Sequence, residues 1–175
     1  MPAIPLKRAD AEALLSNEIL CQKGDDHVGI LRPYTWEEVK LVVAAERLDL
    51  LGRTIDKELA YREDMKKVRE EYGSVLNYVR QVKLAAFIQE TDSKHLVIPN
   101  DYPYALPDNV AHYIVWSKEK LTVGTVPDPD IKCIFEERLG KEVGPGKYEW
   151  IWFVNPPHLQ SIPEVNHGHL IVLQL

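Results

Sequence analysis

Three histidines in strand-like sequence, His112, His167 and His169, could share one face of a sheet, and imidazole is the side chain best suited to chemistry near neutral pH. His167 and His169 stand two residues apart in the extended segment 166–172, so they project from one face of a strand. His112 lies in the alternating segment 110–116 and joins them if the two strands are sheet neighbours. We therefore predict that the three histidines form an acid and base cluster. The alternative is that they are structural histidines, held in hydrogen bonds or solvated.

The same three residues also fit a metal site. A His-x-His pair on one strand, with a third histidine on its neighbour, satisfies the geometry of a three-histidine zinc site with an open position. No helical metal-binding motif accompanies the pair, and His-x-His spacing is common by chance. We expect a metal-free cluster, and a zinc site at His112, His167 and His169 remains the alternative.

Polar and aromatic residues near these strands are candidates for a pocket. Asp101 precedes an aromatic-proline turn, where its carboxylate could orient an imidazole as in a catalytic dyad, although ordinary turn chemistry also explains it. Asn155 opens a rigid proline loop after a strand, a common place for functional side chains. The predicted substrate-binding residues are Tyr102, Tyr104, Trp116 and Asn155.

Composition and motifs exclude several classes of function. Acidic residues outnumber basic ones by 27 to 21, giving a net charge of -6, so nucleic acid is a poor partner. No glycine loop has the Gly-x-Gly-x-x-Gly spacing of a phosphate site, so we expect no nucleotide cofactor, and none of another kind. No apolar run reaches the roughly 20 residues of a membrane span, and the start of the chain lacks an apolar signal core. We expect a cytoplasmic protein.

The pattern of apolar residues predicts helices first and strands second. Helices are expected over 10–20, over 36–50 behind a Thr35–Glu38 capping box, and over 56–87. Gly73-Ser74 interrupts the last of these, so that either Ser74 caps a second helix or Gly73 allows a close backbone approach. Strands are expected over 95–99, 110–116, 148–154 and 168–173, with a helix inserted over 128–139.

This order favours a single α+β domain. We expect a mostly antiparallel sheet of about four strands packed on the N-terminal helices. Residues 1–34 would form an N-terminal helix and loop, residues 35–92 a helical layer, and residues 93–175 the sheet with its inserted helix. A chain of 175 residues, 45% of them hydrophobic, is long enough to bury roughly 70% of the surface of its unfolded form.

Several motifs of the chain, taken in order, are similar to a known family. They are Glu71-Tyr72-Gly73-Ser74-Val75-Leu76-Asn77-Tyr78-Val79, Asn100-Asp101-Tyr102-Pro103-Tyr104, His112-Tyr113-Ile114-Val115-Trp116-Ser117-Lys118, Trp152-Phe153-Val154-Asn155, Leu159-Gln160-Ser161 and His167-Gly168-His169. Over about residues 36–172 the chain resembles a mostly fungal family of proteins of unknown function, DUF3605. The family pattern has tryptophan at Tyr102, glycine at Ala105 and a bulky residue at Gly168. The resemblance implies a fungal source and a shared framework, but no activity.

Together these observations rank three kinds of function. The first is a small cofactor-independent enzyme of fungal metabolism that uses acid and base chemistry on a small organic molecule, by isomerisation, cyclisation, elimination or hydrolysis. In it His167, His169 and His112 are the acid and base, and Asp101 orients one of them. The second is a non-catalytic module that binds a small molecule or a protein. The third is a zinc-dependent enzyme.

Overall fold

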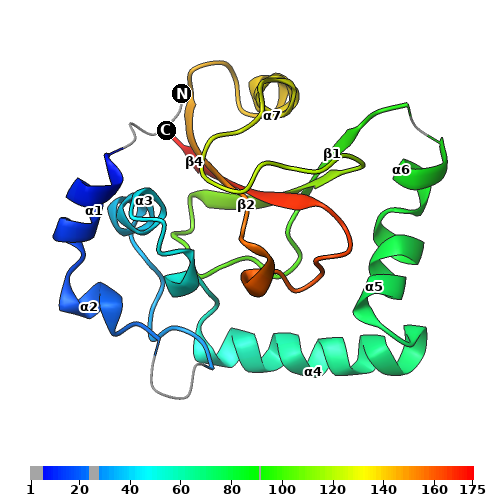
Figure 1. The fold of residues 1–175 in the computed structure, drawn as a ribbon, viewed down its shortest axis with the longest axis horizontal. Helices are drawn as coiled ribbons and strands as arrows, with labels where there is room; N and C mark the ends of the chain where they lie inside the picture. Colours follow the sequence, from blue (N-terminus) through cyan, green and yellow to red (C-terminus); the bar gives the residue numbers. More distant parts are fainter. Residues whose placement is uncertain (1–5, 24–27, 91) are drawn as a thin grey trace.

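The four strands form one antiparallel sheet at the centre of the molecule (Figure 1). The computed structural model describes residues 6–23, 28–90 and 92–175, so parts of the predicted N-terminal segment 1–34 lie outside the described residues, whereas the helix predicted over 10–20 lies within them and divides into two short helices. The strand order is β1-β2-β4-β3, and each neighbouring pair is antiparallel. The strands are β1 (His95–Pro99), β2 (Val110–Ser117), β3 (Tyr148–Phe153) and β4 (His167–Gln174). The predicted α+β class and four-stranded sheet are confirmed.

Most of the helices precede the sheet in the chain. They are α1 (Arg8–Leu14), α2 (Asn17–Leu20), α3 (Trp36–Ala44), α4 (Ile55–Tyr72), α5 (Val75–Tyr78) and α6 (Ala85–Glu90), with α7 (Pro129–Glu142) inserted between β2 and β3. Short helical segments are η1 (Leu48–Leu50), the π-helical η2 (Val79–Lys83) and η3 (Pro157–Leu159). Within the described residues, no helix has both the length and the apolar character that crossing a bilayer requires.

Helix α3 begins with the predicted capping box. The Thr35 hydroxyl accepts a hydrogen bond from the Glu38 amide at 3.2 Å, and the Glu38 carboxylate accepts one from the Thr35 amide at 2.8 Å. The helix ends at Ala44 and does not continue to residue 50, because Glu46 takes a φ of 54°, in the left-handed region. The chain then makes the separate turn η1.

The long helical signal over 56–87 divides at Gly73. This residue has a φ of 81°, which a glycine adopts without strain, and the Ser74 hydroxyl caps the next helix by accepting from the Asn77 amide at 3.0 Å. Of the two alternatives, the cap at Ser74 is therefore confirmed. The break turns α5, η2 and α6 toward the sheet, where Val79 and Phe87 join a cluster with Trp116.

Helices cover both faces of the sheet. One face packs on α3 and η1, with Phe153 in the same cluster as Val39, and on α5 to α6. The other face packs on α7, with Phe135 against Trp150 and Trp152 at ring-centroid distances of 4.9 and 6.1 Å. Figure 1 shows α7 and α4 on opposite sides of the sheet. The inserted helix thus supplies a second layer beyond the predicted N-terminal one.

Gly168 lies under a tryptophan on the face that packs on α7. A Cβ atom at this position would lie 2.6 Å from Cζ2 of Trp152, whose side chain is itself buried. Only a residue without a side chain therefore fits between the two histidines of β4 while Trp152 keeps this position. The glycine thus belongs to the packing of the opposite face rather than to the histidine face.

Candidate functional site

The sheet register brings the three predicted histidines to one face. Ile114 of β2 lies opposite His169 of β4, and Trp116 lies opposite His167, so that His112 is diagonal to His169. Nε2 of His112 lies 2.9 Å from Nδ1 of His169, and the rings of His167 and His169 are 5.8 Å apart. All three side chains are buried. The strands of His112 and His169 are neighbours, as the predicted cluster requires.

Backbone geometry decides which nitrogen of each ring carries a proton. The Tyr104 amide donates to Nδ1 of His112 at 3.1 Å, and the Asn100 side-chain amide lies 3.4 Å from the same atom. Nδ1 of His112 must therefore be the acceptor, so its Nε2–H donates to Nδ1 of His169. It follows that the proton of neutral His169 is on Nε2.

This assignment also determines the orientation of the Asn155 amide. The amide lies 3.2 Å from Nε2 of His169, and with Nδ2 on that side two N–H groups would face each other while the buried Oδ1 had no partner. Exchanging the two amide atoms lets Oδ1 accept from Nε2–H, so the two N–H groups no longer face each other, and moves Nδ2 to the buried position that Oδ1 occupied. The chain of hydrogen bonds then runs from the Tyr104 amide through His112 and His169 to Asn155.

His167 is the exception, because one of its nitrogens is free. Its Nδ1 lies 2.8 Å from the Val165 carbonyl oxygen, which can only accept, so Nδ1 carries the proton and Nε2 carries a lone pair. None of the described residues hydrogen-bonds to Nε2, and this atom is not among the fully buried atoms without a partner. Of the three imidazoles, His167 therefore presents the nitrogen that can accept a proton.

Burial keeps all three rings neutral. It lowers the pKa of His112 to about 3, with the positive charge of Arg53 acting in the same direction. Burial also lowers the pKa of His169 well below its usual value, and lowers that of His167, where the bond to Val165 opposes the change. A buried imidazole in this state is a base or a neutral hydrogen-bonding group at physiological pH.

Two adjoining cavities lie beside the cluster. One of about 200 Å³ and one of about 140 Å³ are both lined by Arg53, Asn100, Ser161, His167 and His169. Of the predicted pocket residues, Tyr104 and Asn155 line the larger, while Tyr102, Trp116 and Asp101 line the smaller. His112 lines neither cavity.

The carboxylate predicted to orient an imidazole lies elsewhere. Asp101 is about half exposed and forms an ion pair with Lys83 of η2. The group that bonds Nδ1 of His112 is the backbone amide of Tyr104. The Tyr102 hydroxyl donates to Asp64 at 3.2 Å, and burial raises the pKa of Tyr102 to about 12. The ion pair with Lys83 therefore accounts for the Asp101 carboxylate, and the side chain that bonds the turn backbone is that of Asn100.

Aromatic rings enclose the two histidines of β4. Tyr104 stacks on His169 at 5.5 Å between ring centroids, and Trp116 lies 4.9 Å from His167. The indole N–H of Trp116 is buried and has no acceptor among the described residues. Because Trp116 also lines the smaller cavity, this side of the site combines an apolar surface with an unused donor.

Sequence reasoning assigned no role to three residues that line both cavities, Arg53, Asn100 and Ser161. They lie outside regular strands and long helices, and the motifs that contain Asn100 and Ser161 show a resemblance but no function for them. The π-helical turn η2 was also missed, although it places Val79 and Lys83 in the lining of the smaller cavity. Single π-helical turns are frequent at functional sites, but the helix-forming residues of this segment do not distinguish a π-helical turn from an α-helical one.

A larger cavity lies away from the histidines. It measures about 620 Å³ and is bounded by α1, α3, the 125–127 loop and β3, with mostly apolar lining side chains. Its charged residues, Glu37 and Lys40, pair with each other at 2.6 Å. This groove offers apolar surface but no group placed to move a proton, so the smaller histidine-lined cavities are the better candidate site.

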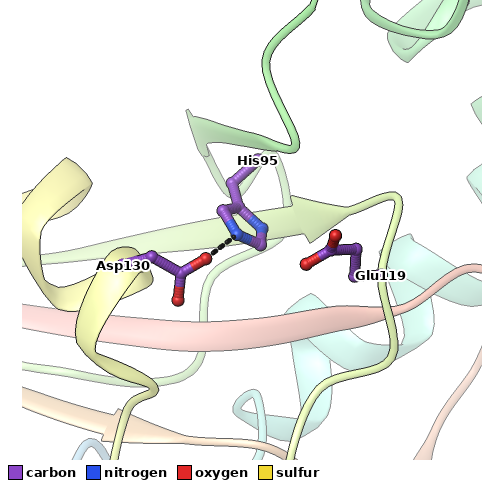
Figure 2. Close-up of side chains that lie close together, drawn as sticks. All are labelled: His95, Glu119 and Asp130. Carbon is purple, nitrogen blue, oxygen red and sulfur yellow. Dashed lines mark hydrogen bonds and ion pairs between the residues drawn. The ribbon is translucent and has the colours of Figure 1, made fainter.

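A second polar cluster lies on the face that packs on α7 (Figure 2). Nε2–H of the buried His95 donates to Asp130 at 2.9 Å, and Glu119 lies nearby in an exposed loop, paired with Lys94 at 2.7 Å. Within the described residues, these are the side chains whose ligand atoms converge, all within 4.8 Å of one another. His95 opens a predicted strand and Asp130 lies in the first turn of a predicted helix, but their approach depends on the packing of α7.

Comparisons with known proteins identify relatives in fungi. The chain is 26% identical over 165 residues to the uncharacterized protein YPL067C of Saccharomyces cerevisiae, covering 85% of this chain and 83% of the relative. It is 22% identical over 173 residues to N-acetylglucosamine-induced protein 1 of Candida albicans, covering 80% and 68%. A solved structure described as the crystal structure of HTC1 matches with a TM-score of 0.52 and 26% identity, over 81% of this chain and 85% of that one. The family model described as "Protein of unknown function (DUF3605)" matches residues 35–173, and the chain therefore belongs to this family.

Proposed function

We propose that the protein is a small cofactor-independent enzyme in which His167 accepts a proton from a small organic molecule. One observation carries this proposal: the bond from Nδ1–H of His167 to the Val165 carbonyl leaves a lone pair on Nε2, beside two cavities. A general base must lie within hydrogen-bond reach of the proton it removes, and only an unprotonated nitrogen can act. The lowered pKa of His167 keeps Nε2 unprotonated at neutral pH.

The other two histidines have a positioning role in this proposal. Both nitrogens of His112 and both of His169 are engaged in the chain of bonds that ends at Asn155. Such a chain holds the face of His169 next to the cavity and stacks it against Tyr104. The proposed substrate is a small molecule rather than a nucleic acid, in line with the net charge of -6, and we expect the enzyme in the cytoplasm.

The cavities favour this reading over a non-catalytic binding module. Histidines sealed in hydrogen bonds with no cavity beside them would favour the binding module, but His167 and His169 both line open space. A shared zinc ion would first have to break the bond between His112 and His169. A stoichiometric metal that a chelator removes together with activity would support the zinc alternative.

The proton transfer can be tested without knowing the natural substrate. The purified protein is incubated in D₂O with a panel of small ketones, aldehydes and carboxylic acids, and deuterium uptake at carbon is followed by NMR. We expect uptake in at least one compound, and His167→Gln should slow it by about a hundredfold or more, the usual contribution of a general base. His158→Gln is the matched control, because His158 is exposed and lines neither cavity. Equal uptake with His167→Gln would refute the proposal.

A further inference from the structure

Arg53 is held rigidly at the boundary of the two cavities. Its Nε donates to the Tyr102 carbonyl at 2.9 Å, and one Nη1 proton goes to the Glu58 carboxylate at 3.0 Å. The guanidinium carbon lies 3.9 Å from the ring centre of Tyr61, in cation-π contact. The arginine side chain is only 17% exposed. Three contacts, two from α4 and one from the loop before β2, therefore fix the plane and direction of the guanidinium.

These contacts leave part of the guanidinium unused. A guanidinium has five N–H donors, and among the described residues no group accepts from Nη2 of Arg53. Nη2 is also not among the fully buried atoms that lack a partner. Since Arg53 lines both cavities, its free donors are available to a molecule that enters them.

The charged residues around the cavities have a net positive balance, although the protein as a whole carries a net charge of -6. Those that line one or both cavities are Lys23, Arg53, Glu58, Lys83 and Asp101. Glu58 pairs with Arg53 and Asp101 pairs with Lys83, so among the described lining residues the positive charge of Lys23 is left without a counterpart. A ligand with one negative charge would complete this balance.

We infer that the ligand of this site is a small carboxylate, whose oxygens accept hydrogen bonds from the free N–H groups of Arg53 beside His167. A planar carboxylate matches two parallel guanidinium N–H groups, and a single charge matches the excess better than the nearly double charge of a phosphate monoester. Both cavities are smaller than the roughly 300–1,000 Å³ of sites for drug-sized ligands, so the molecule must be small. This inference rests on the proposed function, because it names the substrate class of the same site.

The first experiment uses the unmodified protein. Lactate, pyruvate and benzoate are each titrated against their uncharged amides, while the ¹⁵N signal of Arg53 Nε–H is followed by NMR. The carboxylates should shift this signal and bind about tenfold or more tightly than the amides, the ratio expected for one charge-assisted hydrogen bond. Equal binding of acids and amides, or no shift with any carboxylate at the solubility limit, would overturn the inference. Tighter binding of inorganic phosphate than of every carboxylate would overturn the choice of anion.

Variants then separate this inference from the proposed function. Arg53→Lys keeps the charge but loses the planar pair of donors, and we expect about tenfold weaker carboxylate binding with the fold checked by circular dichroism. Arg62→Gln is the control, because Arg62 also pairs with Glu58 but lines neither cavity, and it should bind normally. Unchanged binding in Arg53→Lys would count against the inference. If Arg53→Lys weakens carboxylate binding but His167→Gln leaves deuterium uptake unchanged, the inference survives and the proposed function fails. If His167→Gln slows deuterium uptake but Arg53→Lys leaves carboxylate binding unchanged, only the inference fails.

Discussion

Nε2 of His112 lies 2.9 Å from Nδ1 of His169, and the backbone amide of Tyr104 determines the direction of this hydrogen bond. The pair therefore works as one neutral unit, because protonating either ring would place an N–H against another N–H. A buried pair of this kind makes the free energy of unfolding depend on pH. The effect of replacing one of its histidines on that dependence can be measured.

The first prediction concerns this pH dependence. The unfolded chain binds protons at its histidines below about pH 6.5, whereas folded His112 binds one only near its pKa of about 3. The unfolded state thus holds more protons between these values, so the free energy of unfolding should fall as the pH falls. The slope is about 1.4 kcal/mol per pH unit for each such histidine.

Urea denaturation between pH 7.5 and 5 measures this slope. His112→Gln is the informative variant, because glutamine can accept from the Tyr104 amide and donate to His169 without titrating. Below about pH 6 the slope should be smaller by about 1.4 kcal/mol per pH unit than in the unmodified protein. An unchanged slope would mean that His112 is not buried as a neutral base.

The second prediction concerns the end of the hydrogen-bond chain. Asn155→Ala removes the acceptor of Nε2–H of His169 and leaves a buried donor unpaired, which should lower the free energy of unfolding by about 1–3 kcal/mol. Asn155→Asp keeps an acceptor and adds a negative charge, so it should raise the pKa of the His112 and His169 pair, as measured by NMR titration. A lowered or unchanged pKa in Asn155→Asp would contradict the assigned direction of the chain.

The third prediction concerns the packing of Gly168. A methyl group here would overlap the buried ring of Trp152, so Gly168→Ala should cost about 1–3 kcal/mol of stability. Trp152→Phe removes the six-membered ring that fills this space, and the double variant should be more stable than the sum of the two single changes predicts. Simple additivity in this double-mutant cycle would show that the two residues do not share the space.

Much of the fold could be predicted because strands and helices leave local periodic signals. Segment 95–99 is the observed β1, and the alternating segment 110–116 is β2 without its last residue. The end of α3 was missed because a single residue in the left-handed conformation, Glu46, stops the helix. Glutamate is a common residue within helices, so the sequence does not indicate this conformation. The second helical layer was missed because helix α7 carries no sign of which sheet face it covers.

The site was less predictable because its contacts join distant segments. The period of β4 places His167 and His169 on one face, but only the register of β2 against β4 brings His112 to His169. The Arg53 guanidinium is positioned by Tyr102 and Glu58, through contacts that no local pattern contains. Sequence patterns therefore predicted which strand face carries His167 and His169, but not the positive charge that Arg53 brings beside them.

The last prediction concerns Asp101 and its neighbour Asn100. Because Asp101 pairs with Lys83, Asp101→Asn should leave the ring ¹⁵N shifts of His112, which report its tautomer, unchanged. Asn100→Ala should change them, since the Asn100 amide lies 3.4 Å from Nδ1 of His112 and its carbonyl oxygen accepts from the Tyr102 amide at 2.9 Å. If Asp101→Asn moved the His112 signals more than Asn100→Ala did, the carboxylate would be the orienting group after all. The comparison is internally matched, because both substitutions lie in the same turn and only one removes a group beside the imidazole.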